Sequence, residues 1–125
     1  MRIQKLLNVG FGAARVGLGV VAGAYPEKVG RTWIGEAAVG PESGVILRAL
    51  AVRDLALGAG TVEAALRDDA RIWIAVSTMA DLGDVAATLI ARKDLPRAGV
   101  LTTTALAGSA AITGIILLAI DLAGD

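Results

Sequence analysis

Four long apolar stretches dominate this sequence and limit what it can fold into. They cover residues Leu6–Tyr25, Val45–Leu66, Ile72–Ala91 and Val100–Ile120. Each is close to the roughly 20 residues that a helix needs to cross the hydrocarbon core of a bilayer, at about 1.5 Å of rise per residue. The last stretch holds no residue that is ionised at neutral pH, so a helix there has no polar face to turn toward water. The stretches therefore predict helices that lie in lipid.

The composition agrees with this prediction and excludes several classes of protein. Of 125 residues, 55% are hydrophobic and 19% are charged, against about 25% charged in an ordinary soluble domain. Twelve basic residues balance twelve acidic ones, so no excess charge attracts nucleic acid. The absence of cysteine and histidine excludes disulfide scaffolds, zinc fingers and Cys or His nucleophiles. We expect no cofactor and no metal, because two neighbouring carboxylates without acidic loop ligands make a poor cation cage.

The connections predict an all-α, four-helix transmembrane bundle that forms a single domain over residues 1–125. Connections 67–71 and 92–99 are short and charged, as antiparallel neighbours require. Connection 26–44 is longer and contains proline and glycine, and its segment around Val29 and Trp33 fits a short helix on the bilayer surface. This first connection is therefore expected to be a partly interfacial loop.

The expected location is the cell membrane, which the chain would cross several times. Arg2 and Lys5 precede an apolar run, as in a signal peptide, but Asn8 and Arg15 interrupt that run. We therefore expect an uncleaved first helix. Basic residues are spread evenly over the two predicted sides, so the positive-inside rule does not orient the chain.

Five charged residues fall near the middles of the predicted helices, where lipid would surround them. An isolated charge at the centre of a membrane helix costs about 2.5–3.5 kcal/mol on insertion scales. Several such costs together would cancel much of the apolar driving force, so these side chains must meet one another inside the bundle or face water. They are Arg15 in the first helix, Arg53 and Asp54 in the second, and Asp81 and Asp84 in the third.

Helical spacing places polar and small residues on a single side of each predicted helix. Each of the four helices is polar on a single side, and this pattern predicts a buried polar centre. The stripes are Gln4, Asn8, Gly12, Arg15 and Gly19; Asp54, Gly58 and Thr61; Ser77, Asp81, Asp84 and Thr88; and Thr102, Ser109 and Thr113.

The predicted centre holds two guanidinium groups and three carboxyl groups, a formal charge of −1. This excess is costly in a low dielectric, so either one carboxyl group is protonated or a cation or proton is taken up. Asp81 and Asp84 lie one turn apart on the same face. We therefore expect these two carboxyl groups to differ in protonation, with one ionised beside an arginine and the other neutral. Arg48 and Glu63 lie nearer helix ends and are expected to extend to the headgroups.

Two segments, RALAVRDLALG at residues 48–58 and ADLGDVAAT at residues 80–88, resemble a known group of proteins. Together with WIG at residues 33–35, they make the chain similar to a family of small actinobacterial membrane proteins that is grouped under a domain of unknown function. The resemblance covers most of the chain and implies a four-helix fold in a membrane. It implies no established activity, so no residue role is carried over.

One hypothesis is an intramembrane acid/base site that acts on or binds a small apolar molecule, for example in epoxide opening, isomerisation or cyclisation. Asp81 and Asp84 would then exchange protons, Arg53 and Arg15 would orient them, and Asp54 would hold Arg53. This hypothesis predicts a closed apolar pocket of on the order of a few hundred Å³ that touches Asp81 or Asp84.

Two further hypotheses stay open, so the sequence leaves it uncertain whether the protein is an enzyme. In the structural alternative, the same five side chains form an ion-pair network that only fixes helix packing. In the transport alternative, Asp81 and Asp84 load and release a proton or cation. Four helices are few to enclose a transport pathway in a single copy, so this alternative requires a homo-oligomer. The expected partners are the lipid bilayer and, for the acid/base site, a small apolar ligand.

Overall fold

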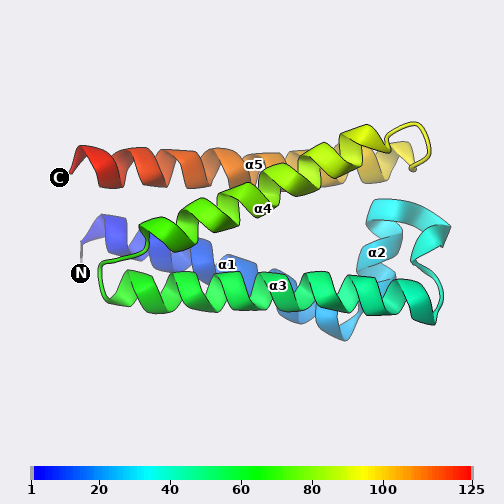
Figure 1. Ribbon diagram of the computed structural model, residues 1–125, viewed down its shortest axis with the longest axis horizontal. Coiled ribbons are helices and arrows are strands. Elements are labelled where there is room, and N and C mark those ends of the chain that lie inside the picture. Colours follow the sequence, from blue (N-terminus) through cyan, green and yellow to red (C-terminus); the bar gives the residue numbers. More distant parts are fainter. Residues whose placement is uncertain (1, 125) are drawn as a thin grey trace.

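Helices account for nearly all of the computed structural model, which describes residues 2–124. Its all-α architecture confirms the predicted fold class at that level. In this range the chain forms five α-helices and one short 3-10 helix. In chain order they are α1 (Ile3–Ala24), α2 (Pro26–Ile34), η1 (Gly35–Ala38), α3 (Pro41–Leu66), α4 (Arg71–Ile90) and α5 (Arg97–Ala123) (Figure 1).

The four long helices, α1, α3, α4 and α5, coincide with the four apolar stretches of the sequence. The helices α3 and α5 begin a few residues earlier than predicted, at Pro41 and Arg97. Pro41 occupies the first helical position, where the missing N–H of proline has no helical partner to lose. Pro96 precedes the first residue of α5 with an extended backbone, so α5 begins directly after it.

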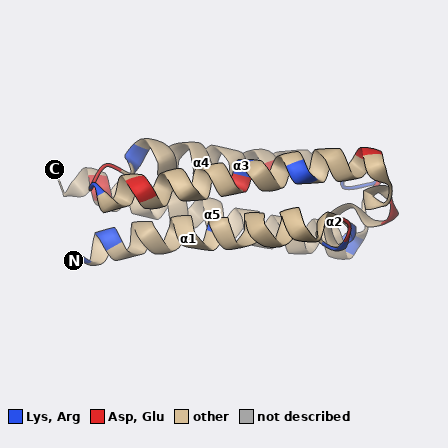
Figure 2. Ribbon diagram, turned by 90° about the horizontal axis from the view of Figure 1, so that it is seen from below, with Lys and Arg blue, Asp and Glu red and all other residues tan. Residues whose placement is uncertain are grey.

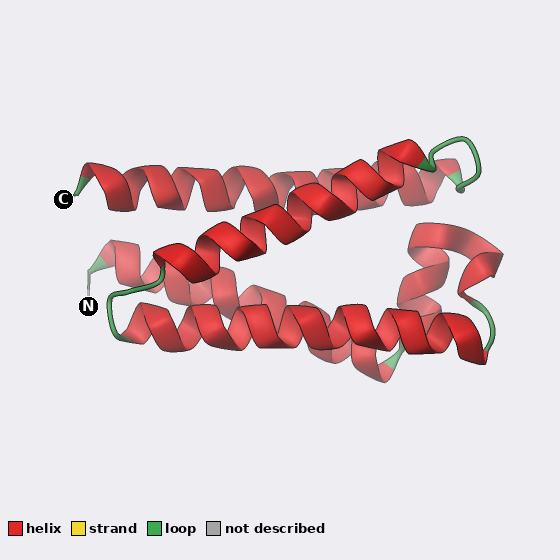
Figure 3. Cartoon of the chain, viewed as in Figure 1, coloured by secondary structure: helices red, strands yellow, loops and turns green. Residues whose placement is uncertain are grey.

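The first connection is more ordered than the predicted loop. Residues 26–38 form α2 and η1, so the described chain has a fifth α-helix where the sequence suggested a loop with a short helical part (Figure 3). Gly35 and Gly40 have φ angles of 69° and 114°, which glycine adopts without strain. These two glycines separate α2 from η1 and η1 from α3.

Three helices of the described chain, α1, α4 and α5, are long and apolar enough to cross a membrane. Helix α3 is longer than α1 and α4 but is not in this group. Every window of 18 residues in α3 includes Arg53, Asp54 and at least one of Arg48 and Glu63, which exceeds two charged residues. Length and composition therefore support three of the four predicted spans.

The long helices associate as two antiparallel pairs, α1 with α3 and α4 with α5 (Figure 1). Helix α4 runs obliquely from the side of α3 toward α5, and the two pairs touch less extensively than the members of each pair. The short helix α2 lies across one end of the molecule, where it contacts α1, α3 and α5. The two ends of the chain lie together at the opposite end.

Glycines allow the backbones of α1 and α3 to touch. A Cβ atom on Gly12 would lie 2.8 Å from the carbonyl oxygen of Gly58, and one on Gly58 would lie 2.7 Å from that of Gly12. Gly19 meets the backbone of Leu55 and Ala51 in the same way. Such close approach gives the dispersion contacts that hold helices together where lipid removes the hydrophobic drive.

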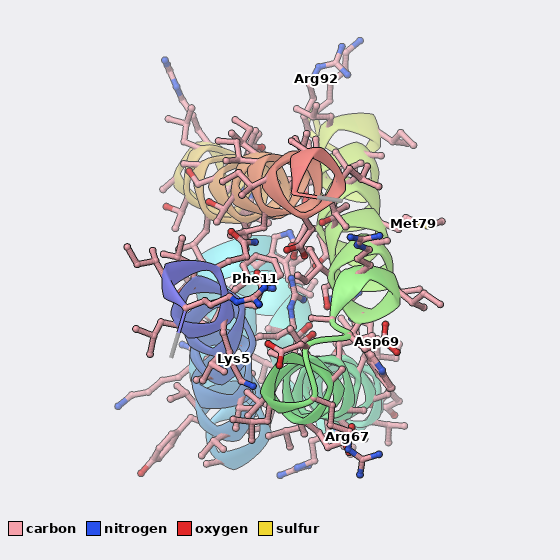
Figure 4. All side chains as sticks on the ribbon, turned by 90° about the vertical axis from the view of Figure 1, so that its left-hand side faces the viewer. Lys5, Phe11, Arg67, Asp69, Met79 and Arg92 are labelled. Carbon is pink, nitrogen blue, oxygen red and sulfur yellow. The ribbon has the colours of Figure 1, made fainter. Side chains whose placement is uncertain are left out.

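The outer surface of the long helices is apolar, and the charges gather elsewhere. Val45, Met79 and Leu101 are 70%, 69% and 60% exposed, and Met79 points away from the bundle in the view along its axis (Figure 4). Figure 2 shows charged residues near the two ends and along α3, whereas α1 and α5 carry few. This distribution suits a protein whose sides meet lipid.

Candidate functional site

All five charges predicted at the helix middles meet inside the molecule. They form one continuous series of alternating charge that connects α1, α3 and α4, and we call it the ion-pair chain. In order of contact it runs Asp81, Arg15, Asp54, Arg53, Asp84.

Arg15 is the most deeply placed cation of the ion-pair chain. Its Nη1 donates to Asp54 Oδ1 at 3.0 Å, and its Nη2 donates to Asp81 Oδ2 and to the backbone oxygen of Ser77. The side chains of Arg15 and Asp81 are each 7% exposed. A guanidinium this deeply buried requires such charged partners, because removing an ion from water costs on the order of several kcal/mol. Gly12 and Gly19 flank Arg15 on the buried side of α1, so the predicted stripe of α1 is confirmed.

Arg53 joins the other half of the chain. It binds Asp84 with two parallel hydrogen bonds, Nη1 to Oδ1 at 2.9 Å and Nη2 to Oδ2 at 2.8 Å. Its Nη2 also donates to Asp54 Oδ1 at 3.3 Å, so that one oxygen of Asp54 accepts from both arginines. Asp54 is thus the central link, and the paired geometry of Arg53 with Asp84 fixes the orientation of both groups.

Asp81 and Asp84, the two carboxylates that the sequence places one turn apart, are held by different elements of the molecule. No hydrogen bond joins them within residues 2–124, and each is bound by a different arginine. Although they lie one turn apart on α4, Asp81 is bound to Arg15 of α1 and Asp84 to Arg53 of α3, because α4 crosses the α1–α3 pair obliquely (Figure 1). Asp54 shares Arg15 with Asp81 and shares Arg53 with Asp84.

Trp33 is part of the site, although the sequence placed it only on a surface helix. Its indole Nε1 donates to Thr88 Oγ1 at 2.9 Å, and Thr88 Oγ1 donates to the backbone oxygen of Asp84 at 2.6 Å. These bonds tie α2 to the part of α4 that holds the ion-pair chain. No spacing pattern indicates this contact, since a tryptophan beside an apolar stretch is typical of the membrane interface.

Helix α5 contributes less polarity to the centre than its predicted stripe implies. Ser109 and Thr113 are exposed, and the Thr113 hydroxyl donates to the backbone oxygen of Ser109 at 2.8 Å. A hydroxyl that bonds its own helix has no need of a buried partner. Helix α5 therefore supplies no member of the ion-pair chain.

A cavity of about 600 Å³ lies beside the ion-pair chain. Leu18 and Leu106 in its wall are 51% and 54% exposed, so it opens between α1 and α5 rather than being the closed pocket that the sequence suggested. Most of the wall is apolar, apart from several threonines and four members of the ion-pair chain. Its charged members are Arg15, Asp54, Asp81 and Asp84, and its aromatic members are Phe11 and Trp33.

A second polar group lies nearer the end that carries the two termini. Gln4 Nε2 donates to Asn8 Oδ1 at 3.1 Å, and Asn8 Nδ2 donates to Asp121 Oδ2 at 3.4 Å. Gln4 Nε2 also donates to the backbone oxygen of Leu117 at 3.3 Å, so this group lies against the apolar core that includes Ile74 and Leu117. The polar residues of α1 therefore belong to two separate clusters, this group and the ion-pair chain.

Comparison of the chain with protein-family models, with curated proteins and with solved structures finds no match. Within the described range, no three potential metal-ligating side chains come together. The site is therefore interpreted from its own geometry.

Proposed function

We propose that this protein is a four-span integral membrane protein that holds a small, largely apolar molecule beside the ion-pair chain. Helices α1, α4 and α5 meet the length and composition of a membrane span. The fourth span is α3, whose central Arg53 and Asp54 are bound inside the bundle and therefore impose little cost toward lipid.

The outward face of α3 supports this assignment. Val45, Ile46 and Val52 are 70%, 63% and 61% exposed, so the face that would meet lipid is apolar. Arg48 is exposed nearer the start of α3, where a long side chain can reach the headgroups. An even number of spans also agrees with the two chain ends lying at one end of the molecule (Figure 1). Membership of the actinobacterial family stays a prediction.

The cavity is the observation that carries the proposed ligand site. Its volume of about 600 Å³ is within the range of small-molecule sites, which combine apolar walls with a few convergent polar groups. In a four-span arrangement, the opening between α1 and α5 faces the hydrocarbon core. An apolar molecule dissolved in the bilayer then enters sideways, without passing through water.

The same site offers acid/base chemistry, with a different pair of carboxylates from the one expected. Both oxygens of Asp84 are occupied by Arg53, whereas Asp54 and Asp81 each keep one oxygen without a partner in the described chain. In the proposed chemistry, one of these carboxylates takes a proton from the bound molecule or from water, and the other, once protonated, returns one. Arg15 holds the two in place. Epoxide opening, isomerisation and cyclisation all fit this pattern.

A purely structural role is the second candidate, because the ion-pair chain connects three helices and occupies the terminal nitrogens of both arginines. Such a network fixes helix register in lipid. The transport hypothesis has less support within one copy, since the apolar core with Ile74 and Leu117 lies between the ion-pair chain and one end of the molecule.

The ligand site is tested by filling it. The protein is extracted from its host membrane with surrounding lipid, and the small lipophilic molecules that copurify are identified by mass spectrometry. Ala107→Trp places an indole in the cavity wall, whereas Leu101→Trp, also on α5 but at an exposed position outside the wall, is the control. We expect a species enriched with the wild type and Leu101→Trp but lost in Ala107→Trp. Identical profiles for all three proteins would contradict the proposed site.

A further inference from the structure

The atoms that the ion-pair chain leaves open indicate what kind of molecule the cavity accepts. Asp54 Oδ2 and Asp81 Oδ1 accept no hydrogen bond from the described chain, whereas the other carboxylate oxygens of the ion-pair chain are bound by arginines. The fully enclosed side-chain atoms without a partner do not include any carboxylate oxygen. Because both residues line the cavity, these two oxygens are acceptors that a bound molecule can reach.

The guanidinium groups, by contrast, are already engaged with carboxylates of the ion-pair chain. Arg15 also lines the cavity, but both of its Nη atoms are bonded and its Nε is enclosed. Arg53 is not part of the wall. The hydroxyl groups of Thr32 and Thr113 donate to their own helices. An anionic headgroup would therefore meet two carboxylate oxygens that repel it, and both guanidinium charges near it are already paired with aspartates.

The net charge points the same way. Two arginines face three aspartates in the ion-pair chain, which leaves a formal charge of −1 beside a largely apolar wall. A cationic donor supplies the missing positive charge and bonds the free oxygens at once. The ring of Trp33 in the same wall adds a favourable surface for a cation, whereas the ring of Phe11 already lies beside the Arg15 guanidinium, 5.9 Å from its central carbon.

We propose that the molecule held in this cavity is a lipophilic amine, whose ammonium group donates to Asp54 Oδ2 and Asp81 Oδ1. Its hydrocarbon body lies against the apolar wall formed by Phe11, Leu18 and Leu106. This inference rests on the proposed ligand site and names the chemical class of its ligand.

The test compares three adamantane derivatives that share one cage and differ in the polar group: 1-adamantylamine, 1-adamantanol and 1-adamantanecarboxylate. The natural chain has no cysteine, so Ala107→Cys introduces a single thiol into the cavity wall. The full-length variant is placed in phosphatidylcholine vesicles at neutral pH and labelled with methyl methanethiosulfonate. The labelling rate is followed by mass spectrometry, at equal membrane concentrations of each compound. Ala105→Cys, exposed on α5 and outside the cavity wall, is the control.

We expect the amine to protect the thiol of Ala107→Cys at concentrations about tenfold or more below those of the alcohol, as charge-assisted hydrogen bonds imply. The carboxylate should protect least, and Ala105→Cys should label equally in all cases. Equal protection by amine and alcohol, or stronger protection by the carboxylate, overturns the amine assignment but leaves the cavity as a ligand site. No protection by any of the three, with the thiol of Ala107→Cys reacting freely, overturns the ligand site itself.

A second comparison assigns the preference to the ion-pair chain. In the Ala107→Cys background, Asp54→Asn removes one negative charge, and the preference for the amine over the alcohol should fall to near onefold. Glu63→Gln on the same helix, exposed and paired with Arg67 near its end, should keep the full preference. An undiminished preference in Asp54→Asn overturns the proposal. The series in Ala107→Cys alone decides the question if the double variant does not fold.

Discussion

Arg15 shows why the individual contacts of the ion-pair chain matter for stability. A guanidinium with 7% of its side chain exposed is stable in this position only while carboxylate partners offset the cost of its desolvation. Asp81 is its more deeply buried partner, with 7% of its side chain exposed against 21% for Asp54. Removing that one charge leaves Asp54 as the carboxylate that Arg15 binds, so much of the desolvation cost of Arg15 is no longer offset.

We expect Asp81→Asn to lower the free energy of unfolding by about 3–5 kcal/mol, the range for breaking a buried pair. Asp68→Asn is the matched control, because Asp68 is 68% exposed where it pairs with Lys5 and such pairs are worth about 1 kcal/mol or less. Asparagine also tolerates the φ of 60° at this position. Unfolding in mixed detergent micelles measures both. Equal losses in the two variants would contradict the buried pair.

Arg53 depends on the planar shape of its side chain. Its two nitrogens reach Asp84 in parallel while one of them also reaches Asp54, which a single ammonium cannot do. We expect Arg53→Lys to destabilise the protein by roughly 1–3 kcal/mol, although the charge is kept. Arg48→Lys, at an exposed site on the same helix, should have little effect in the same unfolding assay. A neutral Arg53→Lys would mean that charge alone holds this link.

At the scale of the elements, the contact between α1 and α3 depends on glycine rather than on large side chains. The Cβ atom of an alanine at position 58 would lie 2.7 Å from the carbonyl oxygen of Gly12, and this backbone atom cannot move aside without separating the helices. Both helices also carry members of the ion-pair chain. Their separation would therefore lengthen the bond between Arg15 and Asp54.

Gly58→Ala should destabilise the protein by about 1–3 kcal/mol, the usual cost of overpacking. Gly83→Ala, inside α4 with nothing within 4 Å of its added Cβ, should instead be neutral or gain up to about 1 kcal/mol from helix propensity. Thermal unfolding of the two variants in the same detergent makes the comparison. A stabilising Gly58→Ala would show that the helices are not in backbone contact.

The short helix α2 is attached to the bundle by Trp33, whose indole bonds Thr88. Trp33→Phe keeps most of the ring and loses this hydrogen bond, so we expect faster amide hydrogen exchange in residues 26–34. Trp73→Phe is the control, since the ring of Trp73 lies against Gly60 on another part of the molecule. Unchanged exchange in α2 would show that its packing, and not the indole bond, holds it.

At the scale of the whole molecule, the number of spans decides on which side each connection lies. With four spans, α2 and the connection at 91–96 lie on one side, and the connection at 67–70 lies on the other. If α3 stayed outside the membrane, α2 and the connection at 67–70 would share a side.

Single cysteines at exposed positions distinguish these arrangements, because the chain has none of its own. We expect the variants Lys28→Cys and Asp94→Cys to react with a membrane-impermeant maleimide from the same side of oriented vesicles, and Asp69→Cys from the opposite side. Reaction of Lys28→Cys and Asp69→Cys from one side would exclude the four-span arrangement.

The sequence is sufficient to predict the long helices and the members of the ion-pair chain. Apolar runs of membrane length leave a helix as the only conformation that satisfies their backbone hydrogen bonds in lipid. Arg15, Arg53 and Asp81 stand out because their cost in lipid forces them inward, so their convergence follows from solvation alone. The ordered helix α2 was less predictable, since its stability comes from packing against α1, α3 and α5.

Only the tertiary structure decides which partner each charge takes and where space remains. The spacing of Asp81 and Asp84 is the same whether they pair with each other or with separate arginines. The oblique direction in which α4 crosses the α1–α3 pair makes that choice. The cavity likewise arises because α1 and α5 touch only slightly, which depends on how two helix pairs are placed against each other. Local solvation cost selects the residues that must be buried, whereas the relative position of distant helices determines what those residues can bind.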